Sequence, residues 1–119
     1  MSTPNPTPSY LPDDADGDAL RRLIDDGSSL DRPMTVDFHI AAADESTARS
    51  IAAVCDRLSF RISISRDDGH TPESWTVTCS TRMVLSHEAV LAMQADLHAH
   101  VSPLGGWVDG WGSFGNART

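Results

Sequence analysis

The stretch that decides the fold is Met-Thr-Val-Asp-Phe-His-Ile at residues 34–40, because apolar and polar side chains alternate along it. A period of two places Met34, Val36, Phe38 and Ile40 on one side of an extended strand. A strand with one apolar face belongs in a sheet that is covered on one side only. The stretch therefore predicts a sheet with one buried face and one open, polar face.

The same period returns later in the chain, where helical patterns separate the strands. Further strands are expected at residues 60–65, 75–80 and 107–109. Helices are expected after the capping residues Asp44 and Ser86, and turn-forming residues at 67–72 join two strands as a hairpin. The resulting βαββαβ order predicts an α+β fold, the ferredoxin-like plait, with a four-stranded antiparallel sheet and two helices on one face.

An additional helix is expected before the plait, over residues 14–26. Leu20, Leu23 and Ile24 form an apolar stripe at helical spacing, and Gly27 suits the position after the last turn. Aspartates at the start of this segment can accept hydrogen bonds from the free N–H groups of the first turn.

The 119 residues are enough for one domain and too few for two. Residues 1–12 hold four of the seven prolines and predict a disordered leader, followed by one domain over 13–116 and a tail over 117–119. No apolar run approaches the roughly 20 residues of a membrane span, and the first residues lack the pattern of a signal peptide. Cys55 and Cys79 lie on apolar faces, so we expect buried thiols in a reducing cytoplasm.

The formal charge is −8, from 17 acidic residues and nine arginines. Between residues 11 and 31, seven aspartates stand against two arginines, which gives a local charge of −5. This balance disfavours nucleic-acid binding, which depends on basic side chains that neutralise phosphates. It favours either a cationic partner, through electrostatic complementarity, or a solvated helix surface that keeps a small protein in solution.

The glycine-rich segment at residues 110–115 matches the pattern G-x-G-x-x-G of dinucleotide-binding loops. That mechanism needs a helix directly after the glycines, whereas here only four residues follow. We therefore expect no nucleotide cofactor. Instead, the glycines are expected to turn the chain so that Trp111 and Phe114 pack against the rest of the protein.

No metal site is expected either. Asp14, Asp16 and Asp18 are spaced like the first ligands of a calcium loop, but the position that requires glycine is Ala19. The five histidines show no metal-binding spacing and are expected to titrate at the surface.

The open face of the sheet offers the only set of residues that resembles a catalytic or ligand site. It is expected to carry Asp37, His39, Arg61, Thr76 and Thr78. The predicted face has no aromatic ring on which an RNA base stacks, so RNA binding of that type is not expected. A small polar pocket under the tail, serving a ligand binder or an enzyme, remains an alternative, as does a solvated sheet face.

Two stretches are similar to a known family. Leu-Pro-Asp-Asp-Ala-Asp-Gly-Asp-Ala-Leu at residues 11–20 and Asp-Gly-Trp-Gly-Ser-Phe-Gly-Asn at 109–116 resemble the opening and closing motifs of the regulator of ribonuclease E activity B (RraB) family. Pro-Met-Thr-Val-Asp-Phe at 33–38 resembles the first strand of that family. The resemblance covers residues 11–116 and implies the same ferredoxin-like fold.

The resemblance also implies a function. Founding members are cytoplasmic inhibitors that bind the arginine-rich scaffold portion of ribonuclease E. We therefore expect a non-enzymatic regulator that binds a basic segment of a partner protein, possessing neither catalytic residues nor a cofactor. The expected contact residues are Asp13, Asp14, Asp16 and Asp18, with Asp109 and Trp111 beside them if the two terminal motifs meet.

This hypothesis carries a condition: the carboxylate oxygens should not already be taken by donors of the same chain. The alternative interpretation is a structural module in which the terminal motifs only close the fold. In that case the substitution Trp111→Ala lowers the melting temperature and leaves the affinity for any partner unchanged.

Overall fold

The computed structural model describes residues 14–67 and 74–116. The predicted leader, Asp13, the predicted tail and most of the predicted turn at 67–72 lie outside the described residues. None of the helices in the two described ranges is long and apolar enough to cross a membrane.

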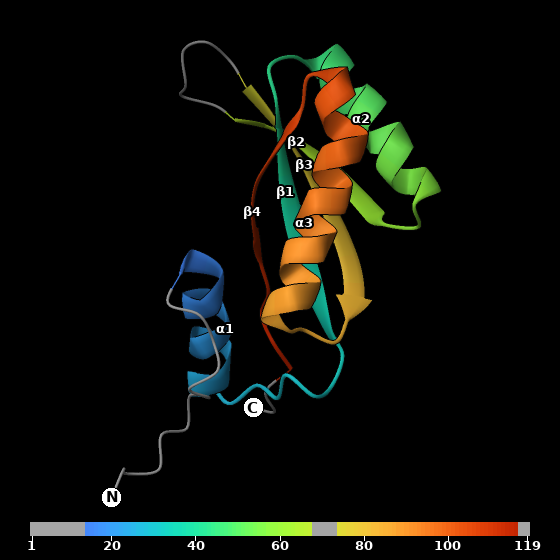
Figure 1. Ribbon diagram of the computed structural model, residues 1–119. Helices are drawn as coiled ribbons and strands as arrows, with labels where there is room; N and C mark the ends of the chain where they lie inside the picture. Colours follow the sequence, from blue (N-terminus) through green and yellow to red (C-terminus); the bar gives the residue numbers. More distant parts are fainter. Residues whose placement is uncertain (1–13, 68–73, 117–119) are drawn as a thin grey trace, which may run out of the picture.

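The described elements follow the expected order of one helix and then a βαββαβ unit (Figure 1). A single 3₁₀ turn, Ser102–Leu104, precedes the last strand. The elements are α1 (Ala15–Asp25), β1 (Met34–Ala42), α2 (Glu45–Arg57), β2 (Arg61–Asp67), β3 (Ser74–Met83), α3 (His87–Val101) and β4 (Trp107–Gly112).

The strands form one sheet in the order β2-β3-β1-β4, and every neighbouring pair is antiparallel. β1 and β3 are central, so Phe38 pairs with Cys79 on one side and with Trp111 on the other. The predicted ferredoxin-like plait is therefore confirmed.

The core lies between the sheet and the two helices α2 and α3, which cover the same face (Figure 1). Along β1 the side chains of residues 34, 36, 38, 40 and 42 are buried and those between them are not. α1 stands beside β4 and α3, and its Leu20 and Leu23 belong to the same buried cluster. The first helix is therefore part of the domain's core.

The helices begin where capping chemistry predicts. Asp14, Asp44 and Ser86 have extended backbones, and each side chain accepts a hydrogen bond from the amide three residues later. Such caps satisfy amides that have no partner inside the helix, and so they determine where each helix starts.

The two cysteines are buried and free, as predicted. A hydrogen bond with Cys55, together with burial, raises the pKa of the Cys79 thiol. The same hydrogen bond lowers the pKa of Cys55, and both side chains are fully buried, so they pack as small groups of the core.

The glycine-rich end of the chain returns to the loop after α1. The side chain of Asn116 accepts a hydrogen bond from the Ser29 amide (2.8 Å) and donates to the carbonyls of Ser29 (2.9 Å) and Arg32 (3.1 Å). Gly115 has a φ of +78°, and a Cβ there would lie 2.1 Å from Oγ of Ser28. Only glycine suits this close approach.

The expectation for the two aromatic residues of this segment is half correct. Trp111 is partly buried and packs on the core. Phe114 does not pack against the protein, because its side chain is 101% exposed. Asn116 and Gly115 hold the backbone against the loop after α1, so the segment needs no aromatic anchor at residue 114.

Candidate partner-binding surface

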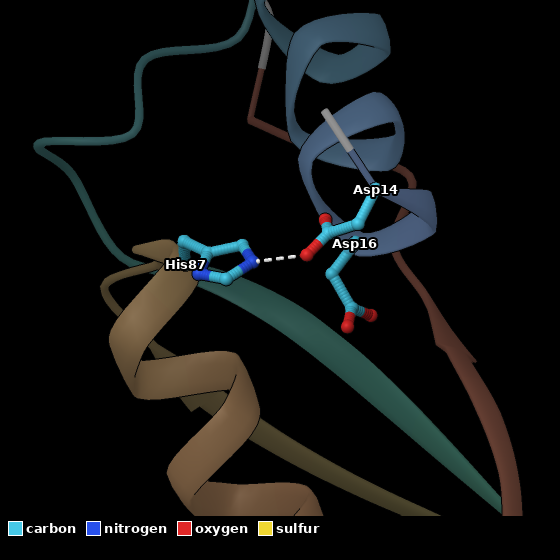
Figure 2. Close-up of side chains that lie close together, drawn as sticks. All are labelled: Asp14, Asp16 and His87. Carbon is cyan, nitrogen blue, oxygen red and sulfur yellow. Dashed lines mark hydrogen bonds and ion pairs between the residues drawn. The ribbon is translucent and has the colours of Figure 1, made fainter. Parts of the chain in front are cut away.

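The acidic residues that the sequence singles out lie at the start of α1, with Asp14 as its N-cap. Asp14 uses both of its carboxylate oxygens. Oδ1 accepts a hydrogen bond from the Gly17 amide (2.7 Å), and Oδ2 lies 2.9 Å from Nε2 of His87 at the start of α3 (Figure 2). The bond from Gly17, and next that with His87, holds the pKa of Asp14 below its usual value of 3.8. This carboxylate therefore ties α1 to α3.

Asp16 ties the opening motif to the closing motif. Its Oδ1 accepts a hydrogen bond from the indole Nε1 of Trp111 (2.8 Å) and another from Nε2 of Gln94 on α3 (3.3 Å). Both donors are neutral, so neither brings a positive charge to the carboxylate. The two terminal motifs do meet in the fold, which is the arrangement that the hypothesis required for Trp111.

Asp18 faces solvent more than the other two. Its Oδ1 pairs with Nη1 of Arg21 at 2.6 Å, within the helix, while 57% of the Asp18 side chain stays exposed. An exposed pair at this spacing adds little stability. Asp18 therefore contributes charge at the surface of α1.

The condition attached to the docking hypothesis fails at Asp14 and is met only in part at Asp16 and Asp18, because each of the three accepts from a donor of its own chain. The consequence is strongest for Asp14, which has no oxygen left. Asp16 and Asp18 each keep an Oδ2 for which the described residues supply no donor. Sequence patterns missed these pairings, since Asp14 and His87 are 73 residues apart and Asp16 and Trp111 are 95 apart.

Asp14, Asp16 and His87 also form a group whose ligand atoms all lie within 4.8 Å of one another (Figure 2). Oxygen and imidazole ligands in such a group suit a divalent cation. Asp14 and His87, however, already bond to each other, and Asp14 and Asp16 also accept hydrogen bonds from Gly17 and Trp111. The group is explained as the polar contact between α1, α3 and β4.

Asp109 lies on β4 at a β-bulge. His39 pairs with Gly110 and Ile40 pairs with Val108, so Asp109 is the extra residue and has no partner on β1. Its side chain is exposed, and the described residues offer it no ion pair. A bulge often turns a side chain outward in this way.

A small groove of about 130 Å³ separates α1 from β4 and the segment after it. Trp111 and Ser113 form one wall. The other wall is formed by Arg22 and Leu23 of α1 and by Asp26, the residue that follows the helix. Asp26 lines this groove, and Asp18 on α1 and Asp109 on β4 are exposed acids of the two elements that border it. We call the side formed by Asp18, Asp26, Asp109 and this groove the α1–β4 surface.

The open sheet face has the polar residues that the sequence predicts. Asp37 accepts a hydrogen bond from the Ser80 hydroxyl, and Nδ1 of His39 lies 3.3 Å from Oγ1 of Thr78. Both side chains are thus bonded to the neighbouring strand β3. Within the described residues, Asp37 and His39 form no hydrogen bond with each other. Neither side chain lines the groove beside α1, the groove at the end of β3 or the hollow on α2. The geometry gives no support to a catalytic pocket there.

Residues 13–113 match the family model described as "Regulator of ribonuclease activity B". The chain belongs to this family. The description is that of a regulator of ribonuclease activity, so membership of the RraB family assigns the chain to the regulation of a ribonuclease. The curated proteins contain no match to the chain.

In this member of the RraB family, the acid stability of the fold should depend on Asp14. Because its folded pKa lies below the unfolded value, Asp14 stabilises the fold above that value, and the contribution is lost as the pH falls through the folded pKa. Asp14→Asn keeps an oxygen for the cap but removes the charge. We expect the stability gap between the natural chain and the variant to shrink as the pH falls below about 4.

Urea unfolding at a series of pH values measures this gap. Asp44→Asn at the equivalent cap of α2 serves as the matched control, since the Thr47 amide and then its hydroxyl lower the pKa of Asp44 in the same direction. It should show the same closing gap. If the difference in unfolding free energy between the natural chain and Asp14→Asn is as large at pH 2 as at pH 5, the lowered pKa assigned to Asp14 is wrong.

Proposed function

We propose that this chain is a cytoplasmic, non-enzymatic regulator that binds an arginine-rich segment of a ribonuclease, or of the scaffold that carries the ribonuclease, through the α1–β4 surface. Family membership is the observation that carries the proposal. Ribonuclease E, which the sequence resemblance implies, is the first enzyme to test. Binding of the regulator to that segment then changes the rate at which RNA is degraded.

The charge distribution supports a basic partner. The chain has a formal charge of −8 and only nine basic residues to oppose its acids. Acids at the edge formed by α1 and β4 attract guanidinium groups and speed their encounter with the surface. The aromatic and aliphatic walls of the groove offer contact area for the methylene stems of arginine.

The roles of the acids differ in this proposal. Asp18, Asp26 and Asp109 are exposed and would meet the partner, and Asp16 would add its charge and its Oδ2. Asp14 and Trp111 act as positioning residues, because their polar atoms hold α1 in place. Asp13 stays in the proposed set of contact residues because it directly precedes Asp14 in the sequence.

The test is a titration of the full chain with an arginine-rich peptide taken from the ribonuclease scaffold. Combined neutralisation by Asp18→Asn, Asp26→Asn and Asp109→Asn is expected to weaken binding about tenfold, since an exposed ion pair contributes about 0.2–1 kcal/mol. Affinity should also fall as salt is raised, because ions screen exposed charges over about 10 Å at 0.1 M.

Glu45→Gln is the matched control, since it removes an exposed carboxylate from α2, on the other side of α3 from α1 (Figure 1). This variant should bind the peptide as the natural chain does. Binding that ignores salt, or that is equally strong in the triple variant, contradicts the proposal.

A further inference from the structure

A second surface, on the opposite edge of the sheet, carries an inference that is independent of the proposed function. β2 pairs with β3 only as far as Arg61 and Ser80, while β3 runs on to Met83. Ser59, in the turn before β2, has a φ of +72° and lines the space beside this end of β3. The result is a groove of about 610 Å³, a size typical of small-molecule sites.

Two arginines line this groove. Arg61 comes from the start of β2 and Arg82 from the end of β3. Both are exposed, and neither has a hydrogen bond or an ion pair within the described residues. By contrast, Arg21 and Arg49 are paired with carboxylates of their own helices. Two of the nine arginines of the chain thus line one groove and offer their guanidinium groups to a ligand there.

The remaining polar groups of the groove are mostly hydroxyls. Thr35, Ser59 and Thr81 line it, and the described residues give these hydroxyls no hydrogen-bond partner. Guanidinium groups bind oxyanions through paired N–H donors, and hydroxyls supply further donors. A carboxylate is satisfied by one guanidinium group, whereas a phosphate group presents more oxygens and about −1.5 to −2 charge at neutral pH.

We propose that this groove binds the phosphate group of a small phosphorylated ligand, with Arg61 and Arg82 as its two charged contacts. Asp56 of α2 also lines the groove and opposes an anion, and it accepts no hydrogen bond from either arginine. Its carboxylate therefore weakens phosphate binding and faces the part of the ligand that carries hydroxyl or amino groups.

The experiment is a titration of the full chain with inorganic phosphate, followed through backbone amide and arginine side-chain NMR signals at constant ionic strength. Saturable shifts are expected at Arg61, Thr81 and Arg82. The variants Arg61→Gln and Arg82→Gln should each weaken binding about tenfold, the effect of one lost charge-assisted contact. Asp56→Asn should strengthen binding about threefold, because it removes a repulsive charge.

Arg49→Gln removes one positive charge from α2 outside this groove and should leave the phosphate affinity unchanged. A titration with sodium acetate at the same concentrations distinguishes a phosphate site from a carboxylate site. The NMR shifts that acetate causes should be at least tenfold smaller than those with phosphate. Equal shifts with acetate, equal losses with Arg49→Gln, or no saturable shifts overturn the proposal. Stronger phosphate binding by Asp56→Asn, against weaker binding by the two arginine variants, distinguishes a specific site from damage to the fold.

Discussion

Replacing Trp111 with alanine is expected to lower the free energy of unfolding by about 3 kcal/mol. The ring packs on the core beside Phe38, its partner on β1, and the indole N–H donates to Asp16 at 2.8 Å. The substitution removes both contributions, and it leaves the Asp16 carboxylate with Gln94 as its described donor. The measurement is chemical denaturation of the natural chain and the variant at neutral pH.

A second substitution separates the hydrogen bond from the packing of the ring. Trp111→Phe keeps an aromatic ring but removes the indole N–H, and it should cost about 1.5 kcal/mol because the acceptor is charged. If Asp16 is the partner, then the costs of Trp111→Phe and Asp16→Asn should not add in the double variant. Additive costs contradict the assigned bond, and a Trp111→Ala variant as stable as the natural chain contradicts the burial.

The same variants distinguish the proposed function from a purely structural role of the terminal motifs. If the α1–β4 surface binds an arginine-rich segment, neutralising Asp18, Asp26 and Asp109 changes the affinity for the peptide without a comparable loss of stability. If the motifs only close the fold, Trp111→Ala changes stability and none of these substitutions changes affinity. One set of proteins measured by denaturation and by peptide titration therefore decides between the two.

The fold was predictable because its signals are local. Alternation along residues 34–40 identifies the central strand without knowledge of its partners, and the structure buries the residues of that alternation. Asp44 and Ser86 were identified as caps in the same way, since a cap bonds an amide three residues later. The βαββαβ order then leaves few topologies that pack two helices on one face.

The candidate site was less predictable because its contacts are not local. Charge counting identified the acids of α1, but no sequence spacing shows that Asp14 meets His87 or that Asp16 meets Trp111. Phe114 is a second example, in which the sequence predicted a contact that the structure lacks. Its aromatic side chain suggested burial, whereas the hydrogen bonds of Asn116 hold the segment and leave the ring exposed.

Leu20→Ala is expected to destabilise the whole domain by about 3 kcal/mol, although Leu20 precedes the βαββαβ unit in sequence. Its side chain is fully buried in the common core, so truncation loses apolar contacts and leaves a cavity between α1 and the sheet. Leu91→Ala on α3 is the matched control, because the same atoms are removed from a side chain that is 45% exposed. It should cost clearly less than Leu20→Ala.

The form of the unfolding curve carries the argument further. If α1 is part of the cooperative unit, the Leu20→Ala variant unfolds in one transition at lower urea concentration, and the tryptophan fluorescence changes together with the far-ultraviolet circular dichroism. If α1 were only docked on a self-sufficient plait, the variant would lose α1 first and the two signals would separate. A single shifted transition means that α1 unfolds only together with the core, so the α1–β4 surface is already formed before a partner binds.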